Sequence, residues 1–176
     1  METACLLADF VESIRAATGA RQVLLVGHSM GGIVVRYYLR YGGRDVLRGR
    51  DCPIGNGDRH ARVNRPGAEA FQRSLDGLHP AEAKTPRLNV YSSCRPTLAR
   101  AVLAPEGLRF VGRDDREDPF YGRTYDPGDG VVTEASVRLP AAPSLQTLLT
   151  CASHNGYHED SGVVRDVVAF LAQPGR

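Results

Sequence analysis

The chain has 176 residues, of which 42 % are hydrophobic and 24 % charged, and its formal net charge is +2 at pH 7. These values are typical of a globular domain and exclude a disordered tail or a fibrous protein. The small net charge and the scattered arginines argue against a nucleic-acid partner. No apolar run is long enough for a transmembrane segment, and the N-terminus lacks the features of a signal peptide. We therefore expect one domain over residues 1–176, cytoplasmic as written, although a missing upstream segment would allow secretion.

The four cysteines are widely spaced, and no cysteine pair or cysteine–histidine cluster has the spacing of a zinc site. We therefore predict no metal and no cofactor. Without a secretion signal, the default expectation is reduced thiols. The four residues are Cys5, Cys52, Cys94 and Cys151.

The first third of the chain predicts a helix, a strand and a second helix. Residues 4–18 place their apolar side chains on one stripe, and Gly19 follows as a stop signal. Gln22–Val26 is a short run of almost entirely apolar residues, which is typical of a parallel strand buried on both faces. A glycine-rich turn then leads into a helix over Ile33–Tyr41, which ends at Gly42-Gly43.

The remainder alternates between further strands and helices, which favours an α/β fold with a mostly parallel sheet. Residues 44–70 show no clear strand. The elements expected after them are a short helix near 67–78, a strand at 87–93, a hairpin over 101–111, a polar loop at 112–130, a strand at 144–151, and a helix over 162–171 with Ser161 as its N-cap.

The segment Gly27-His28-Ser29-Met30-Gly31 matches the pattern G-x-S-x-G between a predicted strand and a predicted helix. A sharp turn of this kind forces the serine into a strained backbone conformation and exposes its hydroxyl. We expect glycine at positions 27 and 31 because side chains there would collide with neighbouring elements. Ser29 is therefore the candidate nucleophile. The Met30 N–H, at the start of the helix, is the candidate donor to an oxyanion.

A serine hydroxyl needs a base to take its proton, and His154 is the best-placed histidine. It follows the predicted strand 144–151 and precedes the terminal helix, at the edge of the sheet where such a base is expected. His158 is the rival. His28 faces away across the turn from Ser29. His60 and His79 precede any plausible acid, whereas this fold has the order serine, acid, histidine.

The acid that orients this histidine is sought in the segment Asp126-Pro127-Gly128-Asp129-Gly130. Asp129 is the better candidate, because glycines flank it and an apolar pair follows that could anchor the loop. Asp126 is the second choice.

Three motifs in order, VLLVGHSMGG, GDGVV and SHNG, resemble those of lipases of the α/β-hydrolase superfamily. Within it, the layout is most similar to the lecithin:cholesterol acyltransferase-like and related bacterial lipase groups. The resemblance implies a partial α/β-hydrolase fold, with helices flanking a mostly parallel sheet. It also implies a triad of Ser29, Asp129 and His154, and a small-molecule or lipid ester as substrate.

Two departures from this family pattern shape the functional expectations. The strands that normally precede the serine turn, one of which brings a second oxyanion donor, are missing, so we expect an N-terminally truncated domain. The strand expected after the serine helix is not recognisable between 44 and 66. The first hypothesis is hydrolysis of carboxylic esters through an acyl-enzyme on Ser29. The alternatives are an acyltransferase using the same residues, or an impaired remnant or interaction module that could self-associate through an exposed sheet edge.

Overall fold

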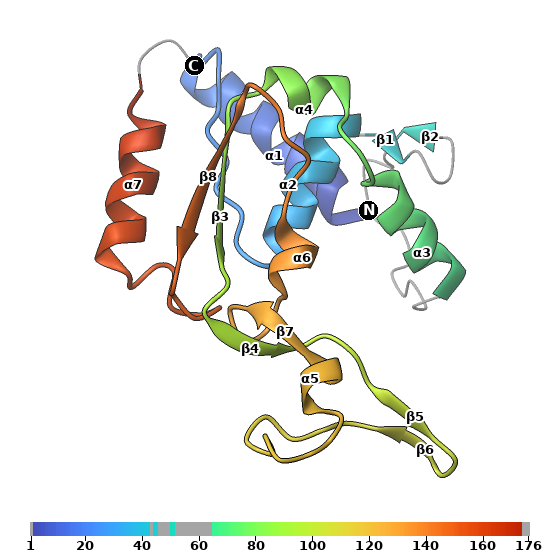
Figure 1. The fold of residues 1–176 in the computed structure, drawn as a ribbon. Coiled ribbons are helices and arrows are strands. Elements are labelled where there is room, and N and C mark those ends of the chain that lie inside the picture. The colour runs from blue at the N-terminus through green and yellow to red at the C-terminus, as the bar shows by residue number, and fades with distance from the viewer. Residues whose placement is uncertain (1, 43, 46–49, 52–64, 174–176) are drawn as a thin grey trace. The chain divides into compact units, whose positions relative to one another are not determined.

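The computed structural model describes residues 2–42, 44–45, 50–51 and 65–173 (Figure 1). The chain divides into two compact units, Met1–Thr85 and Pro86–Arg176, and each is described by itself below. The single domain expected from the sequence stays a prediction.

The first unit is mainly helical. Its helices are α1 (Glu2–Thr18), α2 (Met30–Tyr41), α3 (Arg65–Ser74) and α4 (Pro80–Lys84), and β1 (Arg44–Asp45) pairs antiparallel with β2 (Arg50–Asp51). The predicted first helix is confirmed, and Gly19, at φ 68°, donates its N–H to the Arg15 carbonyl and ends it. Gly42 ends α2 in the same way, with φ 60° and an N–H bonded to the Tyr38 carbonyl.

The core of this unit lies between α1, α2 and the end of α3. Ala4, Tyr37 and Leu75 are buried there, and the Tyr37 ring stacks on Phe71 with centroids 5.4 Å apart. Aromatic pairs of this kind add to the stabilisation that comes from buried area. The apolar stripes of the two predicted helices therefore face each other as an amphipathic pattern requires.

The strand predicted at Gln22–Val26 is wrong. These residues have no assigned strand, and none of the strands in the described part of the chain pairs with them. Leu24 is 58 % exposed and Val26 71 % exposed, whereas burial on both faces was expected. Apolar residues alone do not make a strand, because its backbone N–H and C=O groups need a neighbouring chain to bond.

The segment between α2 and α4 differs from expectation in two ways. Strands β1 and β2 form where no strand was predicted, and the helix expected at 67–78 starts at Arg65 and ends at Ser74. The short helix α4 was not predicted; His79 caps it by accepting the Ala81 N–H at Nδ1. Most of the stretch 44–66, where a further strand was sought, lies outside the described residues, as does His60.

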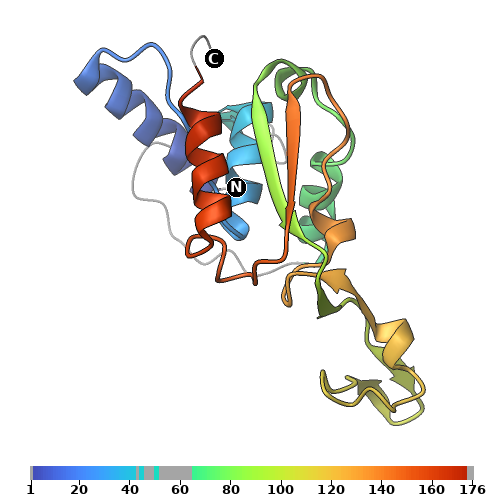
Figure 2. The same ribbon diagram turned by 60° about the vertical axis from the view of Figure 1, so that its left-hand side comes forward.

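The second unit is organised on two parallel strands. β3 (Arg87–Ser92) pairs with β8 (Leu145–Thr150) in a register that runs from Arg87 opposite Leu145 to Ser92 opposite Thr150. Both strands were predicted to within about one residue. Helices α6 (Glu134–Val137) and α7 (Ser161–Leu171) lie on opposite sides of this pair (Figure 2). Helices around a small parallel sheet fit the expected α/β class.

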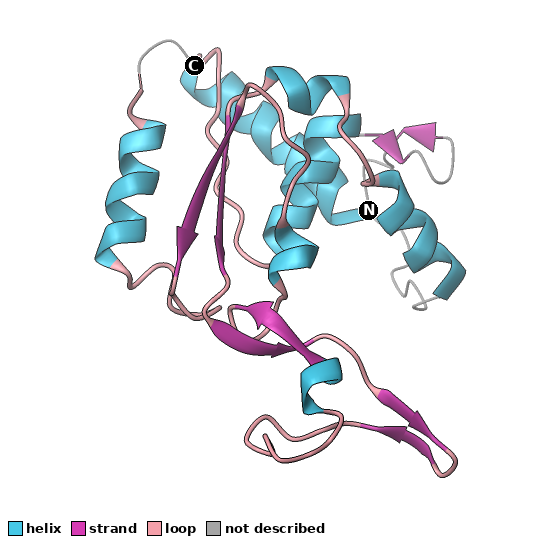
Figure 3. Cartoon of the chain, in the orientation of Figure 1, coloured by secondary structure: helices cyan, strands magenta, loops and turns pink. Residues whose placement is uncertain are grey.

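An arm extends from the ends of β3 and β8 (Figure 3). It consists of β4 (Arg95–Leu98) paired antiparallel with β7 (Tyr125–Gly128), the hairpin of β5 (Val102–Ala104) and β6 (Gly107–Arg109), and α5 (Tyr121–Thr124). The predicted hairpin is confirmed. The polar loop predicted at 112–130 is wrong where α5 and β7 form. Pro96 and Pro127 lie opposite each other in the β4–β7 pair, and proline normally indicates a turn or an edge strand.

The terminal helix α7 begins one residue earlier than expected. Its N-cap is Asp160 rather than Ser161, because Asp160 Oδ1 accepts the N–H groups of Gly162 at 2.9 Å and Val163 at 3.0 Å. A carboxylate at this position also interacts favourably with the positive end of the helix dipole.

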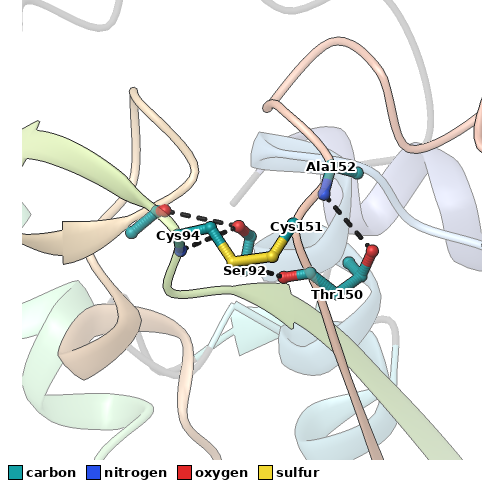
Figure 4. The surroundings of a disulfide bond; sticks show 6 residues. Ser92, Cys94, Thr150, Cys151 and Ala152 are labelled. Carbon is teal, nitrogen blue, oxygen red and sulfur yellow. Dashed lines mark hydrogen bonds between the residues drawn. A yellow bond between two sulfur atoms is a disulfide. The ribbon is translucent and has the colours of Figure 1, made fainter.

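A disulfide bond joins Cys94 to Cys151, so the expectation of reduced thiols is wrong for this pair. Figure 4 shows the bond between the segments that follow β3 and β8. The two Cα atoms are 5.2 Å apart although 57 positions separate the cysteines in the sequence. The parallel pairing of the two strands brings them together, and no local spacing signals it. Cys52 lies outside the described residues.

Among the residues described, no helix is long and apolar enough to cross a membrane. The same residues contain no group of three or more histidine, cysteine, aspartate or glutamate side chains that could hold a metal ion.

Candidate active site

Ser29 has the strained backbone that the G-x-S-x-G motif predicts. Its φ is 55° and its ψ is −128°, and it precedes α2 as the N-cap residue. No other non-glycine residue in the described ranges has a positive φ. Such a conformation costs of order 1–3 kcal/mol, and it persists where the surrounding structure imposes it, often at a functional site. The tight turn is held by hydrogen bonds from Gly31 N–H to His28 O and from Gly32 N–H to Ser29 O.

The two glycines of the motif have different roles. A Cβ atom at position 27 would lie 2.8 Å from the Gly31 carbonyl oxygen and 2.8 Å from Gly32 Cα, so only glycine fits there. A Cβ at position 31 would meet nothing within 4 Å. The expected collision is therefore correct for Gly27 and wrong for Gly31. The close neighbour of Gly27 is Gly32.

Met30 is the first residue of α2. The first N–H groups of a helix have no acceptor within the helix, and together they form its positive end. The Met30 N–H can therefore serve as a donor to a negatively charged oxygen near Ser29.

The second unit holds the candidate acid in a closely packed turn. Asp129 is 5 % exposed and follows Gly128, at which a Cβ would lie 2.5 Å from Thr97 Oγ1 and 2.9 Å from Thr133 Cα. The buried Thr97 hydroxyl accepts the Gly130 N–H at 2.9 Å. Gly130 has φ 99°, which favours glycine. The GDG sequence thus reflects a turn that is packed against β4, and Thr97 is a supporting residue that sequence reasoning missed.

The Asp129 carboxylate is fully engaged. Its Oδ1 accepts the N–H groups of Val131 at 2.9 Å and Val132 at 2.8 Å. Burial alone would raise the pKa of Asp129, but the hydrogen bonds from Val132, from the His154 ring and from Val131 outweigh it and hold that pKa below its usual value. The carboxylate is therefore charged at neutral pH.

His154 lies against this carboxylate. Its Nδ1 is 2.8 Å from Asp129 Oδ2, and its backbone N–H donates to the Asp129 carbonyl at 3.1 Å. An ionised carboxylate only accepts, so Nδ1 carries the proton and Nε2 has the basic lone pair. The structure thus joins two of the three predicted residues, in the orientation that a general base requires.

The two rival residues have other partners. His158 is exposed, and its Nε2 lies 3.6 Å from a Glu159 carboxylate oxygen. Asp126 forms an ion pair with Arg100, at 2.9 Å. Neither rival takes part in the Asp129–His154 pair.

Tyr157 is a member of the site that sequence reasoning missed. Its hydroxyl donates to Asp129 Oδ2 at 3.2 Å. Burial first, then the negative charge of Asp129 and the hydrogen bond to it, raise the pKa of Tyr157 to about 12. The phenol therefore stays protonated and remains a donor. A tyrosine three positions after His154 carries no sequence signal for this role, which depends on the turn at Gly156.

The family model of the alpha/beta hydrolase fold matches residues 3–47, which include Ser29 and Met30. The match supports the α/β-hydrolase superfamily and a hydrolase activity. No curated protein and no solved structure matches the chain significantly. Ser29 belongs to the first compact unit, and Asp129 and His154 belong to the second.

Proposed function

We propose that the protein is a serine hydrolase that cleaves carboxylic esters through an acyl-enzyme on Ser29. The observation that carries the proposal is the strained Ser29 backbone, at φ 55°, in a turn that leads directly into α2. The family match covers this turn. The hydrogen-bonded pair of Asp129 and His154 gives independent support, because it has the tautomer and orientation of a general base.

The proposed reaction has two half-reactions with the same residues. His154 Nε2 takes the Ser29 hydroxyl proton while Oγ forms a bond to the ester carbonyl carbon. The Met30 N–H stabilises the negative oxygen of the tetrahedral intermediate. The C–O bond to the alcohol then breaks, and the imidazolium gives its proton to the departing oxygen. Water repeats the sequence on the acyl-enzyme and releases the acid.

Asp129 stays ionised throughout the proposed cycle. Its lowered pKa supports this role, because a carboxylate that remains charged stabilises the imidazolium when it forms. The mechanism requires Ser29 Oγ within hydrogen-bond reach of His154 Nε2.

Two other functions remain as alternatives. Acyl transfer to an alcohol uses the same residues and differs only in the molecule that attacks the acyl-enzyme. An interaction module is favoured by a specific observation, the exposure of Leu24 and Val26 in a segment without an assigned strand. Such a segment could pair with another chain. In all of these catalytic readings the proposed substrates are lipid or small-molecule esters.

We also propose a cellular compartment for the protein. A disulfide such as Cys94–Cys151 persists in an oxidising compartment and is rare in the cytoplasm. We favour secretion or an oxidising compartment over the cytoplasmic location expected from the sequence.

The test is covalent labelling of the full chain with a fluorophosphonate, followed by mass spectrometry of the labelled peptide, together with hydrolysis of a p-nitrophenyl ester. We expect the label on Ser29 and a loss of about 10⁴-fold or more in kcat for Ser29→Ala. The control is Ser13→Ala, because Ser13 is an exposed serine on α1. Label on another residue, or turnover that survives Ser29→Ala, would contradict the proposed nucleophile.

A further inference from the structure

A small cavity opens beside the Asp129–His154 pair. It has a volume of about 150 Å³, and its lining includes Arg95, Arg113, Gly130, Ser153, His154 and Asn155. All of these residues belong to the second unit. The cavity therefore places two guanidinium groups next to the candidate base, in a space large enough for a small polar group.

The position of Arg95 follows from the disulfide and the β4–β7 pair. Arg95 directly follows Cys94 in the sequence. In the strand pair it lies opposite Gly128, the residue that precedes Asp129. Its carbonyl oxygen also accepts a hydrogen bond from the hydroxyl of the buried Thr97, at 3.1 Å. The backbone at Arg95 is thus fixed to the same turn that carries the candidate acid.

Arg113 belongs to the loop that follows β6, and its side chain also reaches the turn. A Cβ atom at Gly130 would lie 3.1 Å from an Arg113 terminal nitrogen and 3.7 Å from Arg95 Cδ. Glycine at position 130, already required by its φ of 99°, therefore also leaves room for both arginine side chains.

In the part of the chain that the structure describes, the two guanidinium groups have no acidic partner. Within the described ranges, neither Arg95 nor Arg113 forms an ion pair, even though Asp114 and Asp115 directly follow Arg113 in the sequence. Other arginines of the same unit are paired, for example Arg109 with Asp118. Two unneutralised guanidinium groups beside one cavity create a positive potential that attracts an anion.

The two arginines outnumber the one carboxylate of the cavity lining. Asp129 lines the cavity, but its two oxygens are already bonded to backbone N–H groups, to His154 and to Tyr157. Neither oxygen forms an ion pair with Arg95 or Arg113 among the described residues. The planar guanidinium group matches the geometry of carboxylate and phosphate oxygens and binds them with two parallel hydrogen bonds.

We propose that Arg95 and Arg113 bind an anionic group of the substrate, a carboxylate or a phosphate, so that the preferred esters are negatively charged. As a statement about substrate preference, the inference rests on the proposed ester hydrolysis. The binding of the anion itself depends only on the second unit. A charged group in this cavity would hold the ester beside His154. A purely apolar ester has no such group and would lack this contact.

The kinetic test compares esters that differ only in charge. The first pair is mono-p-nitrophenyl glutarate and its methyl ester, which place the charge on the acyl side. The second pair is 4-acetoxybenzoate and its methyl ester, which place it on the leaving group. We expect a higher kcat/KM for the anionic member of at least one pair, and the pair that shows it identifies the side that the cavity holds.

Substitution then assigns the preference to the two arginines. Arg95→Gln and Arg113→Gln should each lower kcat/KM for the preferred anionic ester by about five- to tenfold, the size expected of a hydrogen bond to a charged group at an exposed site. The neutral ester should change by less than about twofold. Arg116→Gln is the matched control, because Arg116 is an exposed arginine of the same loop and is not part of the cavity lining.

Direct binding separates this inference from the proposed function. Monomethyl glutarate and methyl phosphate are titrated into the full-length Ser29→Ala protein, and the amide resonances of Gly130 and Asn155 are followed by NMR. We expect chemical-shift changes that saturate with ligand concentration. The affinity that they give should fall at least threefold in Arg95→Gln. It should also fall at high salt, because the guanidinium groups are exposed.

The outcomes are distinguishable. Saturable binding with no turnover of any ester would retain the anion site and contradict the hydrolase proposal. Turnover of neutral and anionic esters at equal rates, unchanged by Arg95→Gln and Arg113→Gln, would retain the hydrolase and overturn the anion site. Equal losses in Arg116→Gln would also overturn it, because they would reflect general charge attraction.

Discussion

Each compact unit contains a buried carboxylate whose pKa lies below its usual value, yet the two carboxylates have different partners. Glu82 in the first unit is fully buried and bonded to Arg36 Nε at 2.7 Å and to an Arg40 terminal nitrogen at 3.0 Å. Asp129 in the second unit is bonded to backbone N–H groups, a histidine and a tyrosine. Burial opposes ionisation in both cases, and the hydrogen bonds outweigh it.

The difference lies in whether a partner can change its charge. Arginine remains protonated under all ordinary conditions, so neither partner of Glu82 changes its charge, and the cluster serves to join α2 to α4. Arg40 extends this cluster through bonds to the carbonyl groups of Ser74 and Asp76. The histidine beside Asp129 can gain and lose a proton. A buried carboxylate next to a titratable partner is therefore the one suited to catalysis.

The largest expected effect is on the second cluster. Asp129→Asn should lower kcat by about 10³- to 10⁴-fold, because an amide can donate to Nδ1 and stabilise the wrong histidine tautomer. The measurement is ester hydrolysis at pH 7 with the folded fraction checked by circular dichroism. A loss of less than about tenfold would show that Asp129 is only structural.

The next effect should appear in stability. Glu82→Gln leaves two guanidinium groups without a buried counter-charge and should lower the free energy of unfolding by about 3 kcal/mol, measured by urea denaturation. Glu12→Gln is the control, because Glu12 forms an exposed ion pair with Arg15 and should change stability by less than about 1 kcal/mol. If Glu82→Gln reduced kcat more than Asp129→Asn does, the contrast between the clusters would fail.

A smaller effect is expected at Tyr157, which we regard as a positioning residue. Tyr157→Phe removes one donor to Asp129 and should lower kcat about fivefold, the equivalent of one hydrogen bond of about 1 kcal/mol. It should also raise the pKa of Asp129, followed by NMR of the carboxyl carbon, because a bond to the ionised form is lost. A reduced kcat with an unchanged Asp129 titration would indicate that Tyr157 only fills space.

The smallest expected difference concerns the dependence of stability on pH. A carboxylate with a lowered folded-state pKa contributes stability that is present above its unfolded pKa of about 4 and is lost as the pH falls through the folded-state value. Urea unfolding between pH 7 and pH 3 should therefore show decreasing stability on acidification. The slope should be shallower in Asp129→Asn and in Glu82→Gln. An unchanged slope in both would contradict the assigned pKa directions.

The sequence indicated the features that depend on a few neighbouring residues. The strained turn at Ser29 follows from the glycine at position 27. Asp129 and His154 were located from the glycines around Asp129 and from the position of His154 between a predicted strand and the terminal helix, and the structure pairs their side chains. The strands predicted at 87–93 and 144–151 correspond to β3 and β8.

Features that depend on distant residues were not foreseen. The Cys94–Cys151 bond and the β4–β7 pair result from strand pairing between distant segments. The contact of Tyr157 with Asp129 depends on the exact shape of a turn. The strand predicted at Gln22–Val26 was wrong although its local composition was suitable, because composition does not supply a neighbouring strand to pair with.

The Cys94–Cys151 bond also closes a covalent ring that contains the whole arm and Asp129, while His154 lies just outside it. A protease that cuts the exposed hairpin of β5 and β6 opens the ring at one point only. The two fragments would stay joined through the sulfur atoms, so the fragment that carries Ser29 could not diffuse away from the fragment that carries Asp129 and His154. After a single cut, the protein should migrate as one species on a non-reducing gel and as two after reduction.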